Sequence, residues 1–125
     1  MSVMSLTTDN LETTIASNGI VIIDFWAEWC GPCRAFTPVF EAAAEKHTDI
    51  SVASCNTEEQ AEVAAMFQIR SIPTLVVFRD GIPVFGQPGM LPAAALDELL
   101  QKIRELDMDA VRATVAAQET AARSA

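Results

Sequence analysis

Residues 20–33 have the sequence IVIIDFWAEWCGPC. The stretch begins with four apolar β-branched residues, a pattern typical of a central strand that is buried on both faces. It ends with Cys30 and Cys33, which lie on one face of the following helix, about one turn apart, if that helix begins at Gly31 or Pro32. Pro32 suits a first helical turn, because a backbone N–H there would have no partner within the helix. We therefore predict a buried strand, a short loop and a helix that begins with two thiols.

The two cysteines are suited to reversible disulfide chemistry, because at this spacing their sulfurs can form and break a bond without moving the fold. Cys30 would lie at the helix N-terminus, where unpaired N–H groups and the helix dipole favour its thiolate. Two alternatives remain open from the residues: a buried, inert pair, and a zinc site that would also need Cys55 and His47. We expect a redox couple in which Cys30 attacks a substrate disulfide and Cys33 resolves the mixed disulfide.

Length and composition indicate one globular domain. The chain has 125 residues, half of them hydrophobic, which suits a single core. Its formal net charge of −9 argues against nucleic acid or an anionic membrane surface as the main partner. Three cysteines do not make a secreted disulfide framework, and no stretch approaches the ~20 apolar residues of a membrane span. Residues 1–10 lack the basic and apolar regions of a secretory signal, so we expect a soluble, cytoplasmic monomer.

Hydrophobic patterns divide the chain into alternating strands and helices. They predict strands at residues 3–7, 20–25, 50–55, 74–78 and 82–85. They predict helices at residues 10–17, 31–46 and 58–67, and from Pro92 onward. This order predicts an α/β fold with one mixed sheet between helices. We expect one domain of residues 1–106, followed by a C-terminal extension at 107–125 that is helical or disordered.

Turn and cap residues mark several ends of these elements. Thr8 or Asp9 is suited to cap the first helix, and Asn18–Gly19 is suited to end it. Asp80–Gly81 predicts a tight hairpin turn, and Pro83 limits the strand that follows it to an edge of the sheet.

Residues 24–33, DFWAEWCGPC, resemble the active-site strand and loop of the thioredoxin family, and the resemblance covers roughly residues 3–106. It implies the thioredoxin fold and a protein-disulfide reductase. It also implies that an NADPH-dependent flavoprotein, thioredoxin reductase, returns electrons to the cysteine pair. The chain has no glycine-rich cofactor motif, so we expect it to bind no flavin or nicotinamide itself. Beyond the cysteine pair it offers one further cysteine and one histidine, so we expect no bound metal.

Asp24 is an acidic residue inside an apolar strand. Burial should raise its pKa and allow proton exchange near neutral pH. The resemblance implies that Asp24 accepts the proton of Cys33. The family commonly has a lysine on the next strand where this chain has Ser54, so we expect the titration of Asp24 to differ from that of its relatives.

The resemblance also implies a surface on which substrates dock. Ile72-Pro73-Thr74 matches the family's loop that faces the cysteines, in which the proline peptide bond is cis. The backbone of Ile72 would then pair with an extended substrate segment. The expected docking residues share a position around the cysteine pair and are Trp29, Gly31, Pro32, Ile72, Pro73 and Gly89. A flat apolar patch of this kind implies broad protein-substrate specificity.

The residues leave other functions open besides protein-disulfide reduction. The chain could instead be a disulfide oxidant or isomerase, or a binding or chaperone subunit that acts independently of redox chemistry. Cys55 is expected to be a small buried hydrophobe, with a regulatory thiol as the alternative. His47 is expected to help cap the C-terminus of the second helix.

Overall fold

The computed structural model describes residues 3–17 and 19–124. The strands and helices of these residues are, in chain order, β1 (Val3–Ser5), α1 (Leu11–Ile15), β2 (Ile20–Trp26), α2 (Gly31–Lys46), β3 (Ser51–Asn56), α3 (Ala61–Met66), β4 (Thr74–Arg79), β5 (Ile82–Pro88), α4 (Ala93–Arg104) and α5 (Met108–Ser124). The succession matches the predicted one as far as α4, and α5 is a further helix in the tail.

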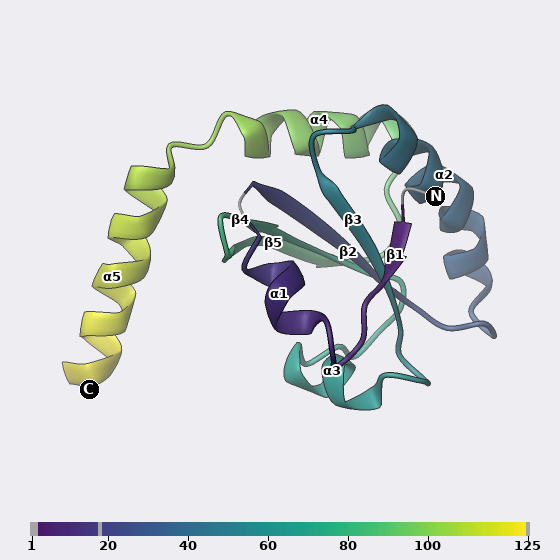
Figure 1. The fold of residues 1–125 in the computed structure, drawn as a ribbon, viewed down its shortest axis with the longest axis horizontal. Coiled ribbons are helices and arrows are strands. Elements are labelled where there is room, and N and C mark those ends of the chain that lie inside the picture. Colours follow the sequence, from purple (N-terminus) through teal and green to yellow (C-terminus); the bar gives the residue numbers. More distant parts are fainter. Residues whose placement is uncertain (1–2, 18, 125) are drawn as a thin grey trace.

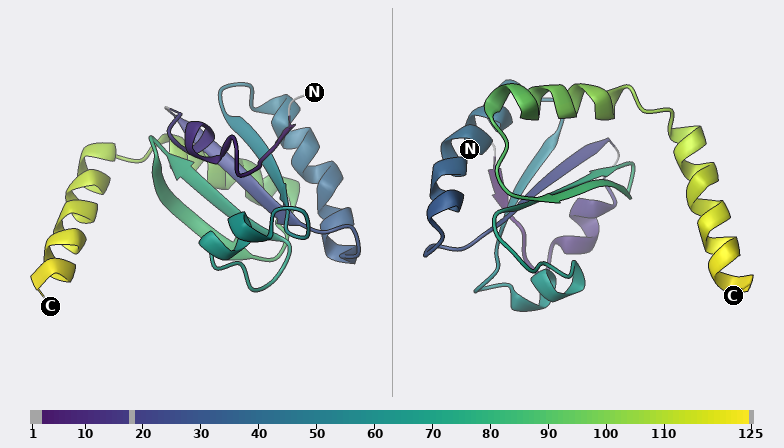
Figure 2. Two further views of the ribbon diagram at one scale, coloured as in Figure 1. Left: turned by 60° about the horizontal axis from the view of Figure 1, so that its bottom comes forward. Right: turned by 180° about the vertical axis from the view of Figure 1, so that it is seen from behind.

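The strands form one sheet in the order β1-β3-β2-β4-β5 (Figure 1). β1, β3 and β2 run parallel, whereas β4 is antiparallel to both β2 and β5. Figures 1 and 2 show α2 and α4 on one side of the sheet and α1 and α3 on the other. The predicted α/β fold with a mixed sheet between helices is confirmed.

β2 lies at the centre because it sends apolar side chains to both faces of the sheet. Ile20 and Ile22 join the core cluster beneath α2 and α4, while Val21, Ile23 and Phe25 join the cluster beneath α1 and α3. The helices contribute to the first cluster through the predicted apolar stripes, whose buried members are Phe36, Phe40, Ala43, Ala44, Leu96, Leu100 and Ile103.

The connection between β1 and α1 differs from the prediction. Asn10 Nδ2 donates to the carbonyl of Ser5 at 2.9 Å, and Asn10 Oδ1 accepts from the backbone N–H of Thr7 at 2.8 Å. This turn ends β1 at Ser5, two residues before the predicted end. The prediction that Thr8 or Asp9 caps α1 was wrong, because Asn10 is the N-cap residue and its side chain is used in the turn.

Two helix starts also differ. α3 begins at Ala61 rather than Glu58, because Asn56 Oδ1 accepts the backbone N–H groups of Glu58 and Glu59 at 2.9 and 3.3 Å and forms a turn there. α4 begins one residue after Pro92, which is its N-cap residue.

The predicted hairpin turn is confirmed. Asp80 and Gly81 have φ angles of 53° and 81°, the left-handed region that such turns require. Gly19, near the end of α1, also has a positive φ, of 89°, and its N–H donates to Asp80 Oδ1 at 2.8 Å. Asn18, predicted to help end α1, lies outside the described residues.

β5 is an edge strand, as Pro83 predicted, but it is longer than expected. It continues past Phe85 to Pro88, and Pro88 is paired with Thr74 of β4. Gly86 and Pro88 have a low intrinsic preference for strands, and pairing with β4 keeps them extended.

His47 is the C-cap residue of α2 and is buried. Its Nε2 lies 2.7 Å from Asp97 Oδ1, and its Nδ1 lies 2.8 Å from Nη2 of Arg104. Because a guanidinium only donates, Nδ1 accepts and Nε2–H donates to Asp97, which describes a neutral ring. Arg104 also pairs with Asp49 at 2.8 and 2.9 Å. His47 therefore ends α2 as predicted, with its backbone N–H bonded to the carbonyl of Ala43 at 2.8 Å, and its ring also links α2 to α4.

The tail forms helix α5, which extends away from the sheet (Figures 1 and 2). Asp107 Oδ1 accepts the backbone N–H of Asp109 at 3.1 Å, which begins the helix. Met108 is buried, and Val111 and Val115 are half-buried beside a cavity of about 360 Å³ between α5 and the start of β5. No helix among residues 3–17 and 19–124 is both long and apolar enough to cross a membrane.

Leu100→Ala tests the packing of α4 on the sheet. Leu100 is completely buried, so its truncation should lower the free energy of unfolding by about 2–5 kcal/mol, measured by urea denaturation. Gln101→Ala, at an exposed neighbouring position of the same helix, is the matched control and should cost less than about 1 kcal/mol. Equal losses in the two variants would contradict the assignment of Leu100 to the core.

Candidate active site

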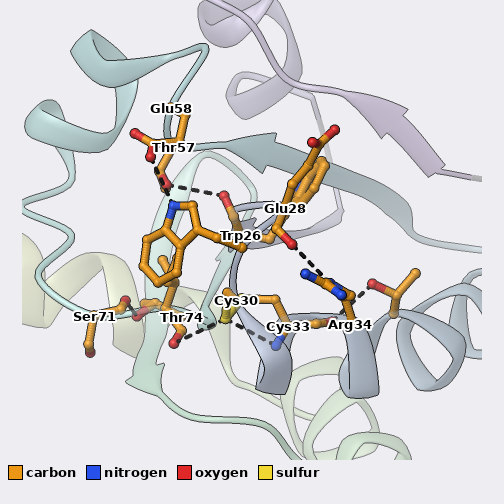
Figure 3. Close-up of a disulfide and its surroundings, with 12 residues drawn as sticks. Trp26, Glu28, Cys30, Cys33, Arg34, Thr57, Glu58, Ser71 and Thr74 are labelled. Atoms are coloured by element: carbon orange, nitrogen blue, oxygen red, sulfur yellow. Dashed lines mark hydrogen bonds between the residues drawn. A yellow bond between two sulfur atoms is a disulfide. The ribbon is translucent and has the colours of Figure 1, made fainter.

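Cys30 and Cys33 form a disulfide at the N-terminus of α2 (Figure 3). Cys30 is the N-cap residue, and its Sγ accepts the backbone N–H of Cys33 at 3.1 Å. Cys30 is 4% exposed and Cys33 is 1% exposed, so the first cysteine lies nearer the surface. Gly31 and Pro32 between them are exposed. The predicted pair is therefore present, with Cys30 at the positive end of the helix dipole.

The loop before β4 lies against Cys30. Cys30 Sγ is 3.7 Å from the carbonyl oxygen of Ile72, a contact in which the thiol of the reduced protein can donate. The Ile72–Pro73 peptide bond is cis, as the resemblance implied. The N–H of Gly89 donates to the carbonyl of Pro73 at 2.8 Å. Three segments that are distant in the sequence thus meet at the cysteine pair.

Trp29 lies at the rim of this site and is 66% exposed. Its indole N–H donates to Glu58 Oε1 at 2.8 Å. Trp29 and Ile72 both line a cavity of about 270 Å³. The other lining residues are Thr57, Ala64, Ile69, Arg70 and Ser71. Two of the expected docking residues therefore share one groove beside the disulfide.

Glu58 was not predicted to be a partner of Trp29. The order of the elements does suggest that the two residues lie close together, since Glu58 follows β3 and Trp29 follows β2. The carboxyl ends of neighbouring parallel strands lie at the same edge of a sheet. Which side chains would bond across that edge depends on the loops and was not predictable from the pattern.

Hydrogen bonds hold the loop that carries Trp29. Thr57 donates from its backbone N–H and its hydroxyl to the carbonyl of Trp26, at 2.8 and 3.1 Å. Arg34 Nε donates to the carbonyl of Glu28 at 2.9 Å (Figure 3). The loop is thus connected both to the end of β3 and to the first turn of α2.

Asp24 is 3% exposed, and its Oδ1 has no hydrogen-bond partner among the described residues. Burial raises the pKa of Asp24 from 3.8 to about 7, which confirms the predicted direction. Ser54 is its neighbour in register on β3, and both line a cavity of about 200 Å³ together with Thr37 of α2. A carboxyl group with this pKa can gain or lose a proton near neutral pH.

Cys55 and His47 lie away from the cysteine pair. Cys55 is buried in the cluster beneath α1 and α3, and burial raises its pKa to about 11. His47 is at the far end of α2, about 24 Å along a helix of 16 residues. Within the described part of the chain, no group of three or more His, Cys, Asp and Glu side chains is arranged to hold a metal ion.

Comparisons with known proteins agree on one family. The thioredoxin family model matches residues 2–117. A protein of Streptomyces coelicolor named "Putative thioredoxin 2" is 50% identical over 121 residues, which is 97% of this chain and 90% of that protein. A thioredoxin of Alicyclobacillus acidocaldarius is 43% identical over 101 residues, 80% of this chain and 96% of its own length.

A solved structure shows the same architecture. A mutant thioredoxin from Halobacterium salinarum is 35% identical, with a TM-score of 0.77 over 84% of this chain and 93% of that one. The mixed sheet and its covering helices are therefore the thioredoxin fold. With this fold, this cysteine pair and a family match over most of its length, the chain belongs to the thioredoxin family of thiol-disulfide oxidoreductases and is a protein-disulfide reductase.

Proposed function

We propose that the chain reduces protein disulfides with Cys30 as the attacking cysteine and Cys33 as the resolving one. The disulfide at the N-terminus of α2 is the observation that carries this proposal. In the reduced protein, the Cys30 thiolate attacks one sulfur of a substrate disulfide, forms a mixed disulfide and releases one substrate thiolate. Cys33 then attacks the Cys30 sulfur and releases the second substrate thiolate. The dithiol loses two electrons, and the substrate gains them.

The position of Cys30 supports its role as the nucleophile. The positive end of the α2 dipole and the N–H of Cys33, at 3.1 Å, both favour a negative charge on its sulfur. Cys33 is one turn further along the helix and more deeply buried, which suits a cysteine that reacts only with its neighbour.

Asp24 is proposed to accept the proton of Cys33 during resolution. A general base is most effective when its pKa lies near the working pH, and burial brings the pKa of Asp24 to about 7. Burial alone accounts for the raised pKa, because desolvation disfavours the charged carboxylate.

Substrates are proposed to dock across the residues around the disulfide. These are Trp29, Gly31, Pro32, Ile72, Pro73 and Gly89. An extended substrate segment would pair with the backbone of Ile72, whose carbonyl already lies 3.7 Å from Cys30 Sγ. Backbone pairing makes few demands on sequence, so we expect many protein disulfides to be substrates.

Electrons are proposed to come from NADPH through a flavoprotein thioredoxin reductase. The chain itself is then a carrier in electron transport, with no bound cofactor, and serves cell redox homeostasis. A cytoplasmic location and a monomeric state fit this role, and the net charge of −9 disfavours nucleic acid and anionic membranes as partners.

Family membership favours reduction over the two alternatives, a disulfide oxidant or isomerase and a subunit that acts independently of redox chemistry. Measuring the reduction potential separates the first alternative, because a value close to those of periplasmic oxidants would contradict a reductase.

Cysteine substitutions should separate the two steps of the reaction. With NADPH and a thioredoxin reductase, Cys30→Ser should abolish insulin reduction, because the attacking thiol is lost and the remaining Cys33 is buried. Cys33→Ser should accumulate a mixed disulfide with substrate, detected by mass spectrometry. Cys55→Ala is the matched control and should keep the wild-type rate, since Cys55 is buried beneath α1 and α3. If the biological activity survived in the Cys30→Ser/Cys33→Ser double variant, the proposed function would fail.

Asp24→Asn should stabilise the oxidised protein at high pH. Between about pH 4 and pH 7, folded Asp24 keeps a proton that the unfolded chain has lost, so the free energy of unfolding falls as pH rises. The gap between 3.8 and about 7 corresponds to roughly 4 kcal/mol. Urea denaturation should therefore find the variant more stable than wild type by up to this amount at pH 8, and by progressively less towards pH 4. A difference that is independent of pH would contradict the raised pKa.

The domain boundary at residue 106 is also a proposal. The family model extends to residue 117, which includes part of α5. A chain ending at Leu106 should keep its insulin reductase rate, because α5 lies at the opposite end of the fold from α2, which begins at the disulfide (Figure 1). Its free energy of unfolding should fall by about 2 kcal/mol with the loss of buried Met108. A truncated chain that fails to fold, judged by circular dichroism, would place α5 inside the domain.

A further inference from the structure

Arg70 lies in the loop between α3 and β4, two residues before Ile72. It lines the groove of about 270 Å³ beside the disulfide, which Trp29 and Ile72 also line. It also lines a second cavity, of about 260 Å³, to which β5 contributes residues 86–88. Residues 69–71 line both, so the two hollows adjoin along this loop. Arg70 therefore borders the groove beside the disulfide and the cavity next to it.

Arg70 carries an unpaired charge. It is the single charged residue that lines either hollow in the described part of the chain, and its exposed side chain forms no ion pair or hydrogen bond with a described residue. By contrast, Lys46 and Arg104 each hold a carboxylate, at 2.6 and 2.8 Å. Glu58 Oε1 accepts the indole N–H of Trp29 and lines neither hollow. All the N–H donors of the Arg70 guanidinium are thus available to a partner.

A carboxylate is the group that best fits these donors. A guanidinium binds a carboxylate through two parallel N–H···O hydrogen bonds, which a neutral side chain does not match. The Ser71 hydroxyl and the side-chain amides of Gln68 and Gln87 line the second cavity as well and can donate to the same anion. The site around Arg70 is therefore complementary in charge and in donors to an aspartate or glutamate side chain.

The partner that reaches this position is the substrate, so the inference rests on the proposed docking of substrates at Ile72. The Ile72 carbonyl is 3.7 Å from Cys30 Sγ, and a segment that pairs with Ile72 does so at or beside its reacting cysteine. The Cα atoms of Arg70 and Ile72 are at most about 7.6 Å apart, because two peptide units join them. An extended substrate advances about 3.4 Å per residue, so a side chain two or three positions from the cysteine comes level with Arg70.

We propose that Arg70 is a specificity-determining residue that selects protein disulfides with an aspartate or glutamate within three positions of the reacting cysteine. Backbone pairing at Ile72 admits many sequences, and Arg70 ranks them by charge. The ion pair forms when the substrate docks and leaves the chemistry at Cys30 unchanged. It therefore raises the second-order rate constant of the first attack, because it strengthens binding of the substrate.

The test is reduction of synthetic peptides by the full-length chain, reduced beforehand with dithiothreitol and then freed of it. Each peptide has one cysteine, joined by a disulfide to 2-nitro-5-thiobenzoate, whose release is followed by its absorbance. This thiol has the lower pKa and is the better leaving group, so Cys30 attacks the peptide sulfur. The series places one glutamate or one lysine at each of the three positions before and after the cysteine. No thioredoxin reductase is present, so the rates report substrate docking and attack alone.

At an ionic strength of about 0.15 M, charges further than about 8 Å away are largely screened. At one or more positions, the glutamate peptide should react about threefold faster than its lysine counterpart, as expected for an exposed ion pair. Arg70→Glu should reverse this order and Arg70→Gln should remove it. Arg70→Lys keeps the charge and should keep the order.

Arg123→Glu is the matched control, because it changes the net charge equally at an exposed position of α5 and should keep the wild-type order. The inference is overturned if wild type reduces glutamate and lysine peptides at equal rates, or if Arg70→Glu keeps the wild-type order. Reversal in Arg123→Glu would also overturn it, since net charge would then explain the preference. Equal reduction of all peptides leaves the proposed function standing, whereas release of no thiobenzoate from any peptide would contradict both.

Discussion

Burial of β2 between two packed layers is the interaction on which the other features of the structure depend. Alternate side chains of this strand enter the two core clusters, and its edges are paired with β3 and β4. A strand committed on both faces and both edges has no freedom to shift its register. The loop that follows it, and therefore the start of α2 with Cys30 and Cys33, occupies a fixed position at the end of the sheet.

The same strand places two groups in opposite electrostatic settings. Cys30 lies at the helix N-terminus, where a negative charge is favoured, whereas Asp24 lies in the packed layer, where it is disfavoured. The helix N-terminus thus favours a negative charge on the Cys30 sulfur, and burial brings the pKa of Asp24 to about 7. Burial of Asp24 lowers the free energy of unfolding at neutral pH, and an apolar residue at this position of β2 would not have this effect.

Much of this arrangement was predictable from the sequence because its causes are local. The apolar run at 20–23, the cysteine spacing and Pro32 predicted a strand, a loop and a helix, and the position of Asp24 predicted its burial. The cis bond before Pro73 came only from the resemblance, since few X–Pro bonds are cis.

Features that depend on tertiary contact were not predictable. Asn10 forms the turn after β1 because its amide reaches Ser5 and Thr7, whereas the sequence offers several equally suitable cap residues nearby. β5 continues to Pro88 because β4 pairs with it, against local preference. Glu58 meets Trp29, and Thr37 comes to line one cavity with Asp24, only through the packing of loops and helices on the sheet.

Because Cys55 is buried, a thiol reagent can report the redox state of the Cys30–Cys33 pair in the folded protein. Its side chain is fully buried and its pKa is raised to about 11, so hardly any thiolate is available to an alkylating reagent at neutral pH. The thiol that meets the reagent in the folded protein is then that of Cys30, which the disulfide with Cys33 removes. The mass added by a thiol reagent therefore reports the fraction of molecules that hold an electron pair, with all three cysteines in place.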